Sequence, residues 1–186
     1  MSYYHGIKTF ERATAIKPAV NTEGCLPVIV GTAPINLATD PAEPNTPVLC
    51  HQMAEAVAAF GYKPDFEKYN IAEAIYTFFS LYGVSPVIFI NVLDKTKHKT
   101  SVSGAQITVT DHMAIIKEDV LLDTLTVKSA DASVKLQVDT DYTAAFDDSG
   151  TVIITLVANS SHYGDTSITV AYDKIDPSKV TTADII

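Results

Sequence analysis

The hydrophobic pattern changes its period near Asp94, and this change constrains the fold more than any other feature of the sequence. Before Asp94 the chain has continuous apolar runs and apolar residues at helical spacing, whereas after it apolar residues alternate with Thr, Ser, Lys, Gln or Asp. Continuous runs are typical of strands covered on both faces, and alternation is typical of half-buried antiparallel strands. The sequence therefore predicts two units of different architecture.

The first unit is predicted over residues 21–94 as an α/β layer. Residues 26–31 and 86–93 are apolar runs bounded by Gly and Pro, which indicates strands covered on both faces. Because helical segments separate them, we expect the two strands to be parallel. Residues 34–47 contain four prolines and predict a loop.

Two helices are predicted between these strands, at about residues 51–60 and 69–82. Gly61 stands where a helix C-terminal glycine belongs. Asn70 and Glu73 have the spacing of a capping box, so Asn70 is expected to cap the second helix. Gly83 and Pro86 interrupt the long apolar stretch that follows, which favours a helix, a turn and a strand over a membrane span.

The second unit is predicted over residues 95–175 as an antiparallel β module inserted into the first. The residues Asp147-Asp-Ser-Gly150 indicate a hairpin between two apolar segments. Short strands at this spacing are typical of a small sandwich or a partly closed barrel. The alternating segments are Ala105-Ile107-Val109, Leu125-Val127, Val134-Leu136-Val138 and Ile168-Val170-Tyr172.

The two ends of the chain differ from both units. Residues 1–20 contain Ile7, Phe10 and Ile16 without a clear period, which predicts an extended arm whose apolar side chains bind elsewhere. Residues 176–186 resemble the start of a capped helix or a returning strand, and they end on two isoleucines. We therefore expect that more chain follows in the complete gene product.

Composition excludes several classes of partner. The 13 basic and 22 acidic residues give a net charge of −9, so the chain lacks the cationic surface needed for nucleic acid or anionic lipid. Charges and aromatic residues occupy the N-terminus, where a signal peptide needs an apolar segment. Two cysteines, Cys25 and Cys50, are too few for a disulfide framework and are expected to be reduced in a protein made in the cytoplasm.

No motif in the sequence predicts catalysis, a cofactor or a metal. The turn Gly31-Thr-Ala-Pro34 follows a strand, but one glycine leading to proline offers too few backbone donors to bind a phosphate. Asp139, Asp141 and Asp147 could bind calcium, although the spacing departs from an EF-hand and favours strand ends and a hairpin turn. The five histidines are scattered without the spacing of metal ligands.

Five blocks in the first half resemble the N-terminal half of contractile phage tail sheath proteins. Each block is short, and their order and spacing carry the resemblance. They are Tyr4-His5-Gly6-Ile7 with Glu11, Pro27-Val-Ile-Val-Gly31-Thr-Ala-Pro34, Asn45-Thr-Pro-Val-Leu49, Ala58-Ala59-Phe60-Gly61 and Pro86-Val-Ile-Phe-Ile-Asn-Val92. The β-rich half resembles the variable outer module of such proteins, and residues 182–186 resemble the point where the chain re-enters the core.

The resemblance implies a structural subunit without catalytic activity or cofactors. Such subunits are made in the bacterial cytoplasm, polymerise around an inner tube in the phage or phage-like tail particle, and contract to drive the tube through a cell envelope. The implied partners are other sheath subunits and, through a C-terminal domain absent from this sequence, the tube protein. Residues 1–20, with Ile7, Phe10 and Ile16, would be the arm exchanged between subunits.

Two other classes of protein remain open from the residues alone. A β-sandwich adhesion or carbohydrate-binding module would account for the second unit, and an exposed aromatic cluster on the sandwich would favour it. An α/β enzyme with an accessory β domain would need a pocket with perturbed carboxylates at the carboxyl ends of the strands.

Overall fold

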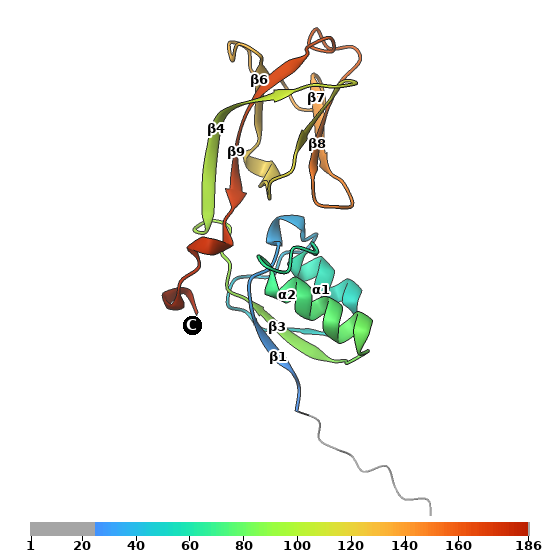
Figure 1. Ribbon diagram of the computed structural model, residues 1–186, viewed down its shortest axis with the longest axis vertical. Helices are drawn as coiled ribbons and strands as arrows, with labels where there is room; N and C mark the ends of the chain where they lie inside the picture. Colours follow the sequence, from blue (N-terminus) through green and yellow to red (C-terminus); the bar gives the residue numbers. More distant parts are fainter. Residues whose placement is uncertain (1–24, 186) are drawn as a thin grey trace, which may run out of the picture.

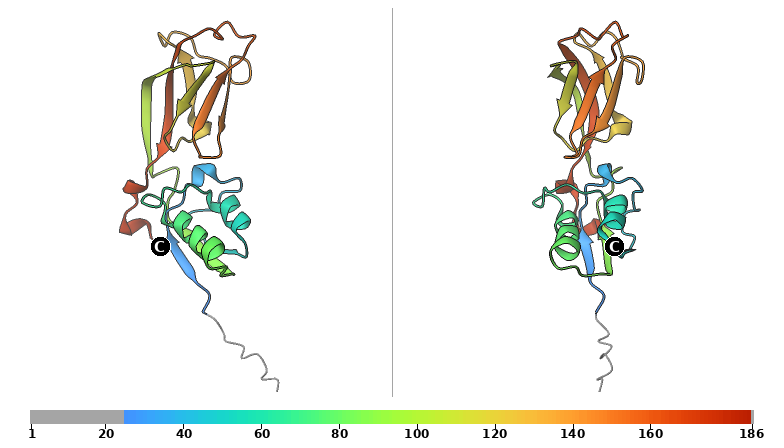
Figure 2. Two further views of the ribbon diagram at one scale, coloured as in Figure 1. Left: turned by 45° about the vertical axis from the view of Figure 1, so that its right-hand side comes forward. Right: turned by 90° about the vertical axis from the view of Figure 1, so that its right-hand side faces the viewer.

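The computed structural model describes residues 25–185, which form two units stacked along the long axis (Figures 1 and 2). The α/β unit holds the three-stranded sheet β1-β3-β2 and two helices, and the β module holds two more three-stranded sheets. The chain enters the β module through β4 and leaves it through β9 (Figure 1). The predicted arm, residues 1–20 with Ile7, Phe10 and Ile16, lies outside the described residues.

The sheet of the α/β unit has β3 at its centre. β1 (Val28–Gly31) pairs with β3 (Val87–Asn91) in parallel, which confirms the predicted strand direction. β2 (Val48–Cys50) pairs with β3 in the antiparallel direction, and its three residues follow the proline-rich loop. This strand was not predicted because a run so short gives no recognisable period. The loop also contains the 3-10 turn η1 (Ile35–Leu37).

Both helices cover the same face of the sheet, because their buried side chains share one cluster with Cys50, Val87 and Phe89 of the strands. α1 (Met53–Phe60) ends at Gly61, whose φ of 72° fits the predicted helix terminus. α2 (Asn70–Ile75) continues as the wider π-helical turn η2 (Tyr76–Leu81). Phe60, Ile71 and Ile75 pack from the helices against Phe89 of β3.

Two expectations for the α/β unit are wrong. Strand β1 is covered on one face only, because both helices lie on the same side and leave Val28 and Val30 exposed. Asn70 does not cap α2, which begins after Tyr69 and has no side-chain cap. The Asn70 carboxamide oxygen instead accepts a hydrogen bond from the amide of Thr32, at 2.7 Å, so the side chain joins the helix start to the end of β1.

All strand pairs within the two sheets of the β module are antiparallel. One sheet has the order β4-β9-β6 and the other β5-β8-β7. Within the described residues the two sheets do not join into a closed barrel, which favours the sandwich over the partly closed barrel. The strands are β4 (Lys99–Thr108), β5 (Met113–Ile116), β6 (Thr126–Ser129), β7 (Tyr142–Phe146), β8 (Val152–Leu156) and β9 (Ser167–Ile175), with the 3-10 turn η3 (Leu122–Thr124) before β6.

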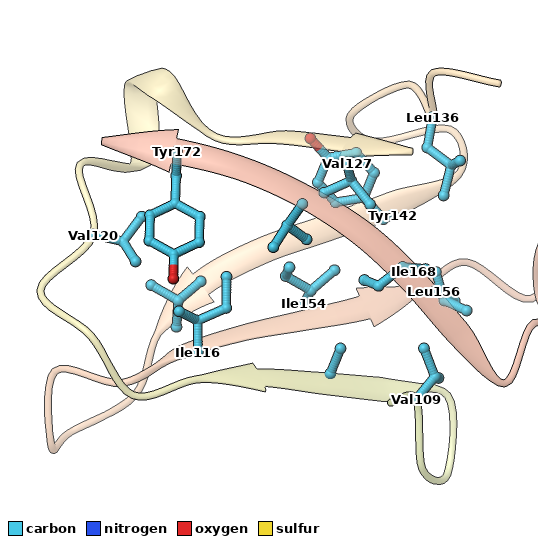
Figure 3. Close-up of a cluster of buried hydrophobic side chains, with 13 residues drawn as sticks. Val109, Ile116, Val120, Val127, Leu136, Tyr142, Ile154, Leu156, Ile168 and Tyr172 are labelled. Atoms are coloured by element: carbon cyan, nitrogen blue, oxygen red, sulfur yellow. The ribbon is translucent and has the colours of Figure 1, made fainter. Parts of the chain in front are cut away.

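The core of the β module lies between its two sheets (Figure 3). Ile168, Val170 and Tyr172 alternate along β9 and point into this core, as their spacing predicts. Ile154 on β8 and Val127 on β6 pack against them. Every member of this cluster belongs to residues 102–172, so the module has a hydrophobic core of its own.

The predicted hairpin forms around Asp147–Gly150, between β7 and β8. The predicted strand at Val134–Val138 does not form. Leu136 is buried, but Val134 and Val138 are exposed, and the segment has only isolated bridges to its neighbours. A positive φ at Ala132 and at Asp139 bends the backbone on both sides of the segment, which prevents continuous pairing. β5 was not predicted.

The described residues after β9 form two 3-10 turns, and the capping box of the second fits the predicted start of a capped helix. η4 (Pro177–Lys179) follows Asp176, whose side chain accepts a hydrogen bond from the amide of Ser178. η5 (Thr182–Asp184) begins with a capping box between Thr181 and Asp184. Asn45 donates a hydrogen bond of 2.9 Å to the carbonyl of Asp184, so this segment packs beside the loop that precedes β2.

Candidate assembly surface

The face of the three-stranded sheet that faces away from the helices is apolar. The strand register places Val28 opposite Ile88 and Val30 opposite Ile90, and Leu49 also lies opposite Ile88. Residues directly opposite each other in a sheet point to the same side. These five side chains therefore form one surface, which we call the open face.

Exposure separates the open face from the helix-covered face. Val28, Val30 and Leu49 are 52%, 45% and 47% exposed, and Ile88 and Ile90 are half-buried. Their neighbours Val87 and Phe89 on β3 point to the opposite side and are fully buried against the helices. Contiguous exposed apolar side chains of this kind are typical of surfaces that bind another chain or another part of the same protein.

Both edges of this sheet are also open among residues 25–185. β1 and β2 are the outer strands, and each pairs with β3 alone. An edge strand presents backbone donors and acceptors that can pair with an added strand. The described part of the chain thus combines an apolar face with two edges that could accept an extended segment.

The polar side chains at the carboxyl ends of β1 and β3 form hydrogen bonds with the backbone around them. The Oδ1 atom of buried Asn91 accepts hydrogen bonds from the amides of Ala33 and Leu93, at 3.2 and 3.1 Å. Its Nδ2 atom donates to the carbonyl of Leu93 at 2.8 Å. A Cβ atom added at Gly31 would lie 2.0 Å from the Asn70 carboxamide oxygen. Asn70 and Asn91 therefore pack beside the Gly31–Pro34 turn and hydrogen-bond to its backbone.

The aspartates that suggested calcium are used in turns. The Asp147 carboxylate accepts hydrogen bonds from Ser149 and from the amide of Thr151, and these bonds hold its pKa below the usual value. The Asp141 carboxylate accepts from the Ser160 hydroxyl and the Gln137 amide. Among residues 25–185, no group of three or more His, Cys, Asp or Glu side chains is arranged to hold a metal ion.

The two cysteines are free, Cys25 exposed and Cys50 buried. Burial, with a contribution from the nearby Glu55 carboxylate, raises the pKa of the Cys50 thiol to about 11. A thiol with so high a pKa is a poor nucleophile at neutral pH. In the described part of the chain, no helix is long and apolar enough to cross a membrane.

An apolar sheet face with open edges is typical of a protein that assembles with other chains. A search of family models finds no match to the chain. Over its whole length the chain is 31% identical to a segment of the tail sheath protein of Burkholderia phage BcepMu. This match confirms that the chain is related to phage tail sheath proteins. The chain spans 36% of the length of that relative.

Sequence reasoning and the structure identify different parts of the candidate surface. The predicted arm residues Ile7, Phe10 and Ile16 lie outside the described residues, so their role stays a prediction. The open face was missed because the continuous apolar runs suggested that both sides of each strand were covered. The sequence did contain a signal for the open face. Both predicted helices lie in the single connection between the two strands, and this placement is consistent with both helices packing on the same face of the sheet.

Proposed function

We propose that the chain is the N-terminal part of a structural subunit of a contractile phage tail sheath. The subunit polymerises with identical subunits around an inner tube, and the assembled sheath contracts to drive the tube through a cell envelope. It needs no cofactor and breaks no covalent bond. The observation that carries this proposal is the 31% identity to a tail sheath protein along the entire chain.

The open face and the open edges of the α/β unit support an assembly role. Each edge can receive an extended segment, and main-chain hydrogen bonds then provide affinity without special side chains. We propose that residues 1–20 are such a segment and that they bind another subunit, with Ile7, Phe10 and Ile16 filling apolar positions. The tube protein would be bound by a part of the subunit that follows residue 186.

The described residues of the sandwich lack the exposed aromatic cluster that would favour a carbohydrate-binding module. The strongly exposed aromatic residues among residues 25–185 are Tyr76 and Tyr82, and both belong to the α/β unit rather than the sandwich. A carbohydrate-binding face built on the sandwich would need aromatic side chains there.

A cavity lies beside Thr32 at the end of β1, and Glu118 and Asp176 line it. Hydrogen bonds from Lys174 to Glu118, and from Ser178 to Asp176, lower the pKa of both carboxyl groups, so they are held in the charged form and suit a structural role better than general-acid catalysis.

Immunoelectron microscopy tests the proposal. Antibodies raised against the β module should decorate the tails of phage or phage-like particles along their whole length. An immunoblot of the same particles should detect a band much larger than 20.0 kDa if the chain is a fragment of a longer subunit. Decoration confined to a tail tip or fibre would contradict the sheath role, and a 20.0-kDa band would contradict only the fragment proposal.

A further inference from the structure

The junction between the α/β unit and the β module contains a buried ion pair. The Lys63 ammonium lies in the loop between α1 and α2 and contacts the Asp119 carboxylate, which lies in the loop after β5. Their side chains are only 16% and 7% exposed. Lys68 approaches the other carboxylate oxygen of Asp119 at 3.8 Å. Residues 56 positions apart in the sequence are thus joined across the two units.

Each partner of this pair is fixed to its own unit. The Asp119 carbonyl accepts a hydrogen bond from the amide of Ile175, at 3.0 Å, and the amide of Leu121 donates to the carbonyl of Asp173 at 2.9 Å. These two bonds hold the loop after β5 against the end of β9. The loop that carries Lys63 contributes Tyr62, Phe66 and Tyr69 to a hydrophobic cluster.

That hydrophobic cluster spans the junction beside the ion pair. Leu121 and Ile175 from the β module pack with Ile35, Tyr69 and Leu93 from the α/β unit. The Tyr69 hydroxyl is buried beside Asp119, and burial together with the Asp119 charge raises the pKa of this phenol. The Asp119 side chain is largely buried, and Lys63 is the nearer of the two ammonium groups that compensate its charge.

Two further contacts join the units around the same loop. The Asn36 side chain donates a hydrogen bond of 3.3 Å to the carbonyl of Val120, next to Asp119. The β7–β8 turn approaches η1 closely, because a Cβ atom added at Gly150 would lie 2.7 Å from Cδ1 of Leu37. Together with the two chain connections that lead into β4 and out of β9, these contacts give the junction several separate attachments.

We propose that Lys63 and Asp119 form a clasp that fixes the β module on the α/β unit, so that the two move as one rigid body in solution. Domains joined within one chain move relative to each other unless their interface is extensive and apolar. Here the apolar cluster is small, and removing one partner of a buried ion pair leaves an uncompensated charge that favours opening of the interface to water. Among the attachments of the junction, the ion pair is the one that a single charge change opens to water, so we expect it to control how rigid the junction is.

Distance measurement by double electron–electron resonance tests the clasp. Spin labels are placed at Glu73→Cys on α2 and Gln106→Cys on β4, which are exposed positions on the two units. Cys25→Ser removes the exposed native thiol. With the clasp intact we expect a single narrow distance distribution.

Charge reversal separates the clasp from a general loss of stability. Lys63→Glu should broaden the distribution and shift its mean, whereas the conservative variant Lys63→Arg, which keeps the positive charge beside Asp119, should keep the narrow peak. Lys135→Glu, the same charge change at an exposed position of the β module, should leave the peak unchanged. Should Lys63→Glu fail to fold, Lys63→Gln replaces it and should broaden the peak less. A narrow peak at the original distance in Lys63→Glu, or a peak in Lys63→Arg as broad as in Lys63→Glu, would overturn the proposal.

Discussion

Gly150 connects backbone conformation with the contact between the two units. Its φ of 76° is unfavourable for a residue with a Cβ atom, by about 1–2 kcal/mol. Gly150→Ala would also bring the new methyl group against Leu37, so Leu37 must move away from the junction. We expect Gly150→Ala to lower the free energy of unfolding by more than this backbone cost alone, as measured by urea denaturation.

Gly104→Ala is the matched control for this prediction. Gly104 has a similar φ of 66°, but no atom lies within 4 Å of the position that a Cβ atom would take there. Gly104→Ala should therefore lower the free energy of unfolding only by the backbone cost. An equal decrease in the free energy of unfolding in the two variants would indicate that the β7–β8 turn does not contribute to the junction.

Asp131 should titrate far below the usual range for an aspartate. Hydrogen bonds from the Ser129 hydroxyl, and then from the amide and hydroxyl of Ser133, lower its pKa to about 2. Because the folded-state pKa is below the unfolded value, the stability from these bonds is present above that unfolded value and disappears as the pH falls through about 2. Ser129→Ala should raise the pKa in an NMR titration, with Asp131→Asn identifying the signal. An unchanged midpoint in Ser129→Ala would contradict this account.

At the scale of elements, the β module should fold on its own. Its core cluster draws only on residues 102–172, and the paired strands β4 and β9 bring the two ends of the module together. We expect an excised chain of residues 97–176 to show the circular dichroism of β structure and one cooperative thermal transition. Its midpoint should be lower than in the complete chain, because Leu121 and Ile175 lose the apolar neighbours they have at the junction.

Ile154→Asp in the excised module provides the control for cooperative folding. Ile154 is fully buried between the sheets, and an unpaired carboxylate there has no compensating partner. This variant should abolish the thermal transition. A non-cooperative signal from the unmodified module would contradict the prediction that residues 95–175 are a separate domain.

At the scale of the whole molecule, the proposed sheath role makes the N-terminal arm necessary for assembly and dispensable for folding. Deletion of residues 2–17 from the complete subunit should prevent the formation of sheath tubes, because backbone pairing with a neighbouring subunit is lost. The core strands β1 and β3 would remain, so the circular dichroism and thermal transition should change little. Electron microscopy of the purified variant detects the tubes.

Either of two results would contradict the role of the arm. Normal tubes from the deletion variant would show that residues 2–17 are dispensable for assembly. An unfolded product would show instead that the arm belongs to the core of its own subunit. A deletion within the exposed loop at residues 158–159, which leaves the arm intact, is the control and should still give tubes.

The sequence by itself determined those features that depend on neighbouring residues. The apolar runs around Val30 and Phe89, separated by helical segments, are sufficient to predict a parallel pair, and Asp147–Gly150 is sufficient to predict a hairpin. Such signals are local, because a turn or a period is set by residues only a few positions apart. The relation to sheath proteins was also accessible from the sequence, through the order of the five blocks.

The tertiary structure alone decided which surfaces are covered and which distant residues meet. An apolar run predicts a strand but does not specify its neighbours, so the exposure of Val28 and Val30 depended on both helices packing on one face. Asn70 binds Thr32 rather than capping its own helix, because the end of β1 offers an unpaired amide there. Lys63 and Asp119 carry no motif, and their pairing follows only from how the two units pack together.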